Sequence, residues 1–396
     1  MLTRNTPRVL HVCPIGLTLR AKVRPVIDVL LEHGYEVEAA CSYDEDAAWM
    51  QEQGYTVHRV PIPRTLKAPL RSLAAVRELA KIIRRGNYTI VHSHTPAGGL
   101  HANFIAKRAG ARFLFYSIRG LPYPFEERSG WPVRRALVWT HAKMVSQADL
   151  VFAVGRYLKQ EVLRTSALPE DRIVVVSGSG VYLEAFTGTP LERERARQEI
   201  RAQLGIPVTA PVAVIVTRVV WEKGIGELVW ALKLLEDDFP DLHLLIVGWG
   251  PAEEGTRALA QRLGVAQRVK ITGWQEHSRV PQFLWASDFF VFPSYYREGF
   301  PIAPLEAMAA GLPVIASDIP PCREQIRPGE NGLLVPVRNA EALAYAMATL
   351  LRNPGLGQEL VRRAQEMLPR YTVEVSARQH LEAYNQFLAS ASGWDG

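Results

Sequence analysis

A chain of 396 residues is longer than one ordinary hydrophobic core supports, so two domains of roughly 150–200 residues are expected. Hydrophobic residues make up 48% of the chain and charged residues 22%, which, without any low-complexity tract, is the composition of a soluble globular protein. The net charge of +6 suits an anionic surface or a phosphorylated ligand and does not choose between membrane, nucleic acid and nucleotide.

The cysteines and the N-terminus indicate the compartment. Cys13, Cys41 and Cys322 are an odd number without paired spacing, which predicts a reducing compartment and excludes a disulfide framework or a zinc ribbon. The first residues run directly into a predicted strand at 8–13, so no signal peptide is expected. No apolar stretch approaches the roughly 18–20 residues that a membrane-spanning helix needs. The sequence therefore predicts a cytoplasmic protein.

The first half of the chain alternates predicted strands and helices. Residues 8–13 and 35–41 are predicted strands that flank a helix at 21–33, which is a βαβ unit. The loop at 14–18 holds only one glycine, Gly16, so the dinucleotide fingerprint Gly-x-Gly-x-x-Gly is absent and no nicotinamide cofactor is predicted. Further strands are predicted at 55–60, 89–92, 113–118, 150–154 and 173–176, and helices at 70–85, 98–108 and 133–148.

A second alternation follows a polar, highly charged segment at 187–207, which is predicted to be a linker with a short helix. Its strands are predicted at 211–216, 243–247, 269–272, 289–292, 313–316 and 332–335, and its helices at 225–237, 256–263 and 340–351. The expected fold is α/β, with two Rossmann-like doubly wound parallel sheets facing each other across a cleft. The predicted domains are residues 1–186 and 208–374, and a last helix at 375–390 is expected to pack back on the first domain.

Charged residues and glycines follow two predicted strands of the second half. Arg218 and Lys223 lie five residues apart, before a helix that starts at Gly224. Cations and backbone N–H groups at a helix start suit a diphosphate, and ligands of open α/β sheets bind at the carboxyl ends of strands. Gly248 and Gly250 follow the next strand and would let a ligand approach the backbone closely. The structural alternatives are a solvated loop and a plain turn.

Two carboxylates lie where a third strand of this half gives way to a helix. Glu298 is in the loop after that strand, and Glu306 is inside a short helix that Pro301 starts and Gly311 ends. Carboxylates at such a strand end suit a ligand that is rich in hydroxyl groups. The alternatives are a solvated helix residue for Glu306 and a partner of the helix dipole for Glu298.

These residues resemble a known family. The stretch Glu298-Gly-Phe-Pro-Ile-Ala-Pro-Leu-Glu306 is similar to the Glu-x7-Glu signature of family-4 retaining glycosyltransferases of the group 1 type, which have the GT-B fold. Further matches are Arg218, Lys223-Gly224, Thr272-Gly273 and residues 329–336. The resemblance covers essentially the whole chain and is most specific over residues 210–340.

The resemblance implies a role for each of these residues. The family's first glutamate contacts the donor sugar and its second the nucleotide ribose, roles that fall on Glu298 and Glu306. Arg218 and Lys223 would neutralise the diphosphate, and Trp274 would flank the base. The donor site is then expected to be completed, without a metal or other cofactor, by Gly16, Gly248, Gly250, Gly299, Phe300 and Pro301.

The first half resembles the family's acceptor domain, through residues 14–18 and 91–99. His92 and His94 are candidates for contacts with the acceptor, and His94 also for a catalytic role. The alternative is that a strand-end histidine is only a structural hydrogen bonder. Many members carry a His-Gly pair where this chain has Arg119-Gly120. A guanidinium stays protonated, so Arg119 would not act as an acid or base and would pair with a phosphate instead.

Two further patterns have a plain interpretation beside a functional one. Asp44-Glu-Asp46 matches a metal-binding Asp-x-Asp pattern, but its place after the second strand predicts a helix start instead. The basic stretches at 64–85 and 120–143 combine cations with leucine and tryptophan, which suits peripheral contact with an anionic membrane on its cytoplasmic face. A core-facing helix with a solvated basic face is the alternative.

The expected function is transfer, with retention at the anomeric carbon, of a hexose or N-acetylhexosamine from a nucleotide diphosphate sugar. UDP is favoured over GDP, and the acceptor is a hydroxyl of a glycan or lipid-linked sugar, in the synthesis of cell-surface polysaccharide, lipopolysaccharide or another glycoconjugate. The alternatives are a nucleotide-sugar 2-epimerase and a non-catalytic nucleotide-sugar-binding protein. Binding of nucleic acid is not expected, because no recognised motif accompanies the basic helix.

Overall fold

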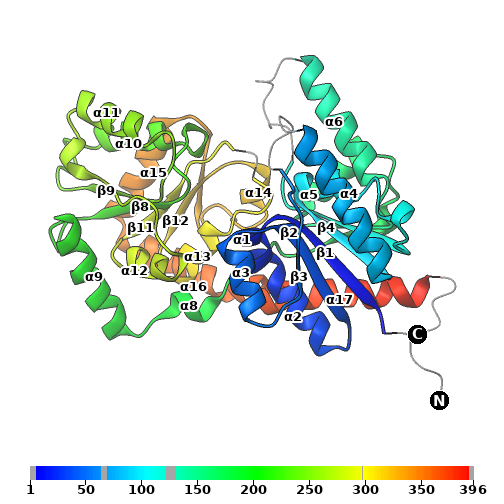
Figure 1. Ribbon diagram of the computed structural model, residues 1–396. Coiled ribbons are helices and arrows are strands. Elements are labelled where there is room, and N and C mark those ends of the chain that lie inside the picture. Colours follow the sequence, from blue (N-terminus) through cyan, green and yellow to red (C-terminus); the bar gives the residue numbers. More distant parts are fainter. Residues whose placement is uncertain (1–5, 64–68, 122–130, 297, 392–396) are drawn as a thin grey trace. The chain divides into compact units, whose positions relative to one another are not determined.

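The computed structural model describes residues 6–63, 69–121, 131–296 and 298–391. The chain divides into two compact units, unit 1 with residues 1–180 and 373–396, and unit 2 with residues 181–372 (Figure 1). Each unit is built on one parallel β-sheet with helices on both faces. The α/β class and the two Rossmann-like sheets predicted from the sequence are therefore confirmed.

The sheet of unit 1 has seven parallel strands in the order β3-β2-β1-β4-β5-β6-β7. The chain runs outward from β1 to β3 and then returns to β4 on the other side of β1. The strands are buried because both faces are covered, as in β6, all of whose residues are buried. Their bounds are β1 (Arg8–Ile15), β2 (Glu36–Ser42), β3 (Val57–Arg59), β4 (Ile90–His94), β5 (Phe113–Ile118), β6 (Leu150–Ala153) and β7 (Ile173–Val175).

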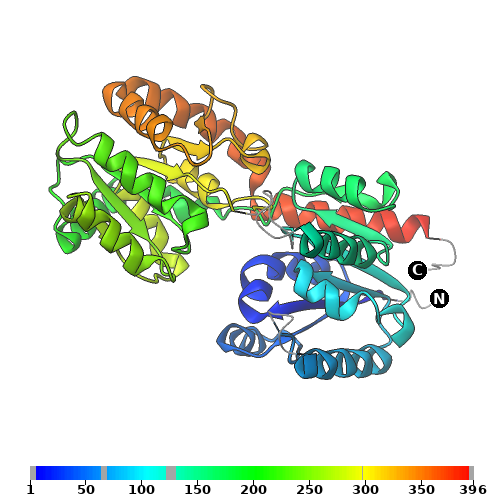
Figure 2. The same cartoon turned by 90° about the horizontal axis from the view of Figure 1, so that it is seen from above.

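The helices of unit 1 include the C-terminal helix of the chain. This helix, α17 (Val373–Ser390), is the red helix of Figure 2 and packs against α2 (Arg24–Glu32). The Tyr35 hydroxyl donates to Asn385 Oδ1 at 2.7 Å. The others are α1 (Gly16–Thr18), a π-helical turn (Leu19–Val23), α3 (Glu45–Glu52), α4 (Pro69–Gly86), α5 (Thr95–Ala102), α6 (Trp131–Val145) and α7 (Arg156–Thr165), with 3₁₀ turns at Lys107–Ala109 and Glu170–Arg172.

The sheet of unit 2 has six parallel strands in the order β10-β9-β8-β11-β12-β13. They are β8 (Val212–Val216), β9 (His243–Val247), β10 (Val269–Ile271), β11 (Phe289–Phe292), β12 (Val314–Ser317) and β13 (Leu333–Val335). The helices are α8 (Leu183–Thr187), α9 (Pro190–Leu204), α10 (Ile225–Leu234), α11 (Glu253–Arg262), α12 (Val280–Trp285), α13 (Ala303–Ala309), α14 (Pro320–Arg323), α15 (Ala340–Arg352) and α16 (Pro354–Met367). Across the described part of both units, no helix combines the length and apolar character that crossing a membrane requires.

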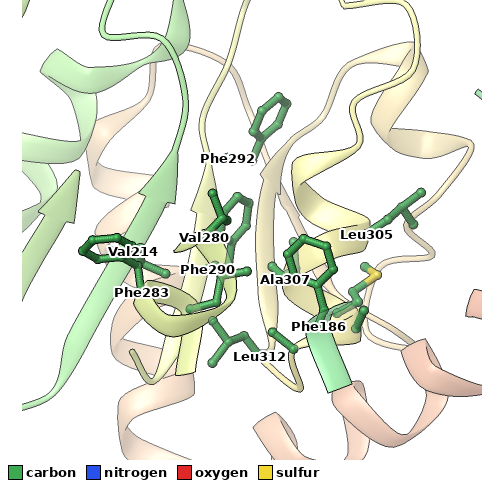
Figure 3. Packing of buried hydrophobic residues seen from close by; sticks show 14 of the residues in the cluster. Phe186, Val214, Val280, Phe283, Phe290, Phe292, Leu305, Ala307 and Leu312 are labelled. Atoms are coloured by element: carbon green, nitrogen blue, oxygen red, sulfur yellow. The ribbon is translucent and has the colours of Figure 1, made fainter. Parts of the chain in front are cut away.

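Two apolar layers cover the two faces of the unit 2 sheet. Along β8, Val212 and Val214 belong to one layer and Ala213 and Ile215 to the other, because strand side chains alternate between faces. Figure 3 shows the first layer, where Phe290 of β11 lies among side chains from α8, α12 and α13. This packing holds in place the strands whose carboxyl ends carry the predicted donor residues.

The segment 187–207, which was predicted to be a linker with a short helix, forms the helix α9 (Pro190–Leu204) over most of its length and belongs to unit 2. The Thr189 hydroxyl accepts from the N–H of Glu192, whose carboxylate accepts from the N–H of Thr189, and this capping box starts the helix. Gly205, with φ +62°, ends it. The helix packs on α12, so the division between the units lies at residues 180 and 181 rather than at a linker.

One arginine anchors α9 to unit 2. Arg201 is fully buried, although its neighbours in the charged segment are mostly exposed. Its Nε donates to the carbonyl of Ala286 at 2.8 Å and its Nη1 to the carbonyl of Ala210 at 2.6 Å, and its Nη2 pairs with Asp288 Oδ2 at 2.9 Å. The guanidinium therefore satisfies backbone carbonyls that would otherwise be buried without a donor.

Replacing Arg201 with methionine should destabilise unit 2 by about 3–5 kcal/mol, the cost of removing one partner of a buried ion pair. The measurement is the shift of the denaturant midpoint followed by circular dichroism. The matched control is Arg195→Met in the same helix, because the Arg195 side chain is 76% exposed and lies 3.8 Å from Glu199. Equal midpoints for the two variants would contradict the anchoring role.

Candidate functional site

The strand order of unit 2 reverses between β8 and β11. The chain continues from β8 to β9 and β10 on one side and from β11 to β12 and β13 on the other, so the loops after β8 and β11 leave the sheet side by side. In open α/β sheets, ligands bind at this reversal. The N–H of Tyr295 donates to the carbonyl of Glu222 at 3.0 Å, which ties the two loops together.

Glycines let these loops touch. Gly224 has φ +74°, and a Cβ there would lie 2.2 Å from the carbonyl oxygen of Pro293. Gly248 has φ +141°, and a Cβ there would lie 1.9 Å from the carbonyl oxygen of Thr217. A Cβ at Gly250 would likewise lie 2.3 Å from the carbonyl oxygen of Val219, in the loop after β8. Loop packing alone therefore requires these glycines.

Lys223 and Glu298, which were predicted to serve different parts of the donor, form an ion pair. Nζ of Lys223 lies 2.5 Å from Oε1 of Glu298, and the Ser294 hydroxyl donates to the same oxygen at 2.7 Å. The two side chains are 15% and 12% exposed, so water screens the pair only weakly. Arg218 is exposed, and no hydrogen bond or ion pair engages its guanidinium in the described part of the chain.

Glu306 lies in the first turn of α13 and is only 8% exposed. Its Oε1 lies 2.8 Å from Nε2 of His277, which comes from a 3₁₀ turn (His277–Arg279) after β10. His277 was not identified from the sequence, since it belongs to no motif and is brought to Glu306 only by the fold.

Two exposed tryptophans lie beyond β9 and β10. Trp274 is 71% exposed and follows Gly273, whose backbone pairs with that of Gly248. Trp249, next to Gly248, is 62% exposed. The bridge between the two glycines places both indoles on neighbouring loops. Trp249 was missed from the sequence, because a single aromatic residue in a loop forms no pattern.

The residues after Glu298 anchor its loop. Gly299 and Pro301 are buried, and the carbonyl of Pro301 accepts from Nε2 of the buried Gln325 at 2.9 Å. The Phe300 ring is partly buried and lies 5.7 Å from the Tyr371 ring. These three predicted donor contacts therefore hold the loop in place through packing, whatever further contact they make with a ligand.

The sheet of unit 1 reverses between β1 and β4, and Gly16 follows β1 at this point. The N–H of Gly16 donates to Asp44 Oδ2 at 2.9 Å, while Oδ1 of the same carboxylate accepts from the N–H of Ala47 at 3.0 Å. Asp44 thus caps α3, the helix start that the sequence predicted in preference to a metal site. A side chain at position 16 would collide with that carboxylate.

Three histidines are buried on one face of the unit 1 sheet. His11 of β1 is in register with His92 of β4, and His94 lies two residues further along. His92 is held by the Tyr384 hydroxyl at 2.6 Å and the Ser117 hydroxyl at 2.8 Å, and His11 Nδ1 lies 2.8 Å from His94 Nε2. Because neither His92 nor His94 is exposed, the structure favours the structural alternative for both residues.

Burial also fixes the charge of these histidines. It lowers the pKa of His11 to about 3 and holds the pKa values of His92 and His94 well below the ordinary value, with positive neighbours adding to the effect. Among the described residues, the three are the group that could bring three metal-ligand atoms within 4.8 Å of one another. Their rings are inclined by 21–38° to one another, and the hydrogen bond between His11 and His94 engages one nitrogen of each of these two rings.

Arg119 follows β5 and is partly buried. Its Nη1 donates to the Ser179 hydroxyl at 2.7 Å and its Nη2 to the carbonyl of Lys22 at 3.2 Å, while its buried Nε has no partner in the described part of the chain. Burial lowers the pKa of Arg119 to about 10. The guanidinium is therefore still protonated at neutral pH, and it cannot supply acid or base catalysis there.

A hollow of about 410 Å³ opens at the carboxyl ends of β2 and β3. It is lined by Ser42, Tyr43, Arg59, Val60, Pro61, Ile62, Pro63 and Arg71. The guanidinium of Arg59 lies 3.5 Å from the centre of the Tyr43 ring, a stacking contact that leaves its N–H groups available in the plane. The hollow thus combines an aromatic ring with cations.

Each basic stretch contains one helix, α4 in the first and α6 in the second. Residues 64–68 and 122–130 lie outside the described residues. In α4, Leu79 and Ile83 are buried, whereas Leu70 and Leu73 are exposed, and in α6 Trp139 is exposed. Part of the apolar face predicted for α4 therefore packs on unit 1, and part of it faces away from the core.

Comparison with known proteins identifies relatives for the whole chain. A model of the glycosyl transferase 4-like domain matches residues 20–178, and a model of glycosyl transferases group 1 matches residues 196–367. EpsD of Bacillus subtilis is 27% identical over 391 residues, which is 97% of each chain. A GDP-mannose-dependent alpha-(1-6)-phosphatidylinositol monomannoside mannosyltransferase of Mycolicibacterium smegmatis is 31% identical over 326 residues, covering 80% of this chain and 79% of that one.

A solved structure agrees with this assignment at the level of the fold. HepE of Anabaena, in complex with UDP and glucose, superposes with a TM-score of 0.80 at 20% identity, covering 96% of this chain and 100% of that one. Such neighbours are GT-B glycosyltransferases, so the predicted fold family is confirmed. With a family model over each half and a relative above 30% identity along most of its length, the chain belongs to the group 1 glycosyltransferases.

Proposed function

We propose that the protein transfers a hexose or N-acetylhexosamine from a nucleotide diphosphate sugar, UDP-linked in preference to GDP-linked, to a hydroxyl of a glycan or lipid-linked acceptor, with retention at the anomeric carbon. The observation that carries the proposal is the grouping of Lys223, Glu298 and Glu306 on the segments where the unit 2 sheet reverses. Cations and carboxylates at this edge suit a ligand that is both phosphorylated and rich in hydroxyl groups.

Donor binding is proposed to exchange the partner of Lys223. Without a ligand, Glu298 neutralises the lysine across 2.5 Å. A diphosphate carries more negative charge than one carboxylate, so it would attract Lys223 together with the exposed Arg218. The exchange would release the Glu298 carboxylate to accept hydrogen bonds from hydroxyl groups of the sugar. Glu306 uses Oε1 for the contact with His277. Its other lone pairs would accept hydrogen bonds from the ribose hydroxyl groups.

The chemical step is then mainly electrostatic. As the glycosidic bond breaks, negative charge gathers on the departing diphosphate, and fixed cations at Arg218 and Lys223 stabilise it. This role needs no metal ion. The acceptor hydroxyl is proposed to attack from the face that the diphosphate leaves, which retains the configuration. The relatives support the substrate class, because their names include GDP-mannose, a phosphatidylinositol mannoside, UDP and glucose.

The acceptor is assigned to unit 1. The hollow at β2 and β3 presents the Tyr43 ring, on which a sugar ring can pack, together with Arg59 and Arg71. Exposed leucines at Leu70 and Leu73 beside the cations of α4 suit an anionic membrane surface that holds a lipid-linked acceptor. Synthesis of cell-surface polysaccharide or another glycoconjugate is the setting that such an acceptor implies.

A thermal-shift panel of UDP, GDP, ADP and their sugars should show the largest stabilisation with UDP and its sugars. A ligand at 100 times its Kd stabilises the native state by about 2.7 kcal/mol, so the shift is measurable. Glu306→Ala should abolish the shift, because the ribose loses its acceptor. The matched control is Glu341→Ala, another first-turn glutamate of unit 2, in α15.

Other outcomes of this panel would show which part of the proposal is wrong. Preferential stabilisation by GDP or ADP would overturn the proposed base, and no stabilisation by any nucleoside diphosphate would contradict the donor site itself. Incubation with UDP-N-acetylglucosamine and no acceptor should give slow hydrolysis at most. Accumulation of the 2-epimer would instead identify an epimerase, and tight donor binding without any turnover would identify a binding protein.

The partner exchange predicts opposite effects of two neighbouring substitutions. Lys223→Gln should weaken UDP binding about tenfold, through loss of a charged contact to the diphosphate. Glu298→Gln should leave UDP binding unchanged or make it tighter, because the lysine loses its competing partner, while sugar transfer falls about a hundredfold through poor orientation. Isothermal titration with UDP and a transfer assay separate the two effects.

The control for this pair is Lys233→Gln, because Lys233 is also paired with a glutamate, Glu236, but lies at the far end of α10. Its UDP affinity and transfer rate should match the wild type. Weaker UDP binding in Glu298→Gln, to the same degree as in Lys223→Gln, would show that the ion pair only supports the loops and is not exchanged.

A further inference from the structure

Arg119 is a partly buried cation with only neutral partners. The Ser179 hydroxyl and the carbonyl of Lys22 accept from its two terminal nitrogens, and no carboxylate lies within ion-pair distance in the described part of the chain. Two other shielded cations, both in unit 2, differ in this respect. Arg201 has Asp288, and Lys223 has Glu298.

The described surroundings of Arg119 contribute no negative charge either. Its ionisable neighbours are His11, His92, His94, His380 and Cys13. Burial, with the charge of Arg119 adding to it, lowers the pKa values of the histidines, to about 4 for His380, so they are neutral at pH 7. Burial raises the pKa of the Cys13 thiol, which therefore also stays neutral. Within the described part of the chain, no negative charge compensates the guanidinium.

A half-buried cation without a carboxylate partner is unfavourable, and ionisable groups with such perturbed pKa values cluster at functional sites. Arg119 lies where ligands of open α/β sheets bind. It follows the carboxyl end of β5, next to β4, and the strand order of unit 1 reverses between β1 and β4. The contacts with Ser179 and Lys22 fix the plane of the guanidinium. They leave Nε–H and further N–H groups for two parallel hydrogen bonds to one oxyanion.

We propose that Arg119 binds a phosphate group of a substrate of the proposed transfer reaction, through a two-point contact with its guanidinium. The inference rests on the proposed function, because that function supplies the phosphates. Two sources have the same chemistry: the diphosphate of the donor, and a phosphate carried by the acceptor. In either position the guanidinium acts by charge and orientation, and no proton is transferred.

The test compares Arg119→Gln and Arg119→Lys with the full-length wild type by isothermal titration. The first arm titrates the nucleoside diphosphate that binds most tightly. The second arm titrates pyrophosphate and glucose 6-phosphate after this nucleotide has saturated the donor site. We expect Arg119→Gln to lose about tenfold in affinity in one arm, and Arg119→Lys to keep part of it because its charge remains. A loss in the first arm identifies the donor diphosphate, and a loss in the second identifies an acceptor phosphate.

The control is Arg108→Gln, which removes an exposed cation from the same unit and should leave both arms unchanged. Wild-type affinity of Arg119→Gln in both arms would overturn the inference, and so would an equal loss in Arg108→Gln, which would indicate diffuse attraction. The melting temperatures of Arg119→Gln and the wild type, measured without ligand, give a second readout. An uncompensated charge predicts that Arg119→Gln melts no lower than the wild type, whereas a lower melting temperature with unchanged phosphate binding would assign a structural role. Failure of the wild type to bind any nucleoside diphosphate would instead contradict the proposed function.

Discussion

The ion pair between Lys223 and Glu298 joins the two loops that leave the unit 2 sheet where its strand order reverses. A shielded cation needs an anion nearby, and the carboxylate supplies it while the Ser294 hydroxyl fixes the carboxylate. The same contact explains the absence of a side chain at Gly224, since the lysine reaches the glutamate only if the loops touch. The donor proposal follows, because a diphosphate can replace the glutamate as the counter-ion.

The sequence predicts the positions of the site residues better than their partners. Apolar runs that end in polar loops locate the strand ends, and parallel sheets bring such ends to one edge, so Arg218, Lys223, Glu298 and Glu306 could be assigned to one region. The pairing of Lys223 with a residue 75 positions later depends on the backbone path of two loops, which residue spacing does not specify. His277 could not be predicted for the same reason.

In the stretch at 187–207, the charge of the sequence does not predict which residue is buried. A segment with many arginines and glutamates reads as solvated, and most of α9 is exposed, yet Arg201 turns inward because carbonyl groups beside α12 and β8 need donors. The surface against which α9 packs determines which of its arginines is buried. The same applies to His92 and His94, whose strand-end position suggested contact with a substrate and whose neighbours bury them completely.

Lys223 of unit 2 and Arg119 of unit 1 differ in their partners, and this difference bears on how each would respond to a phosphate. In unit 2 the lysine is already neutralised, so a diphosphate must displace a carboxylate and gains only the difference between the two partners. In the described part of unit 1, Arg119 contacts only neutral groups, so an oxyanion there would not have to displace a carboxylate. The smaller net interaction energy at Lys223 suits a residue that must release the diphosphate product after transfer. The unpaired charge of Arg119 suits a contact that forms only when a phosphate binds. Such a contact would stabilise the protein with bound substrate over the free protein.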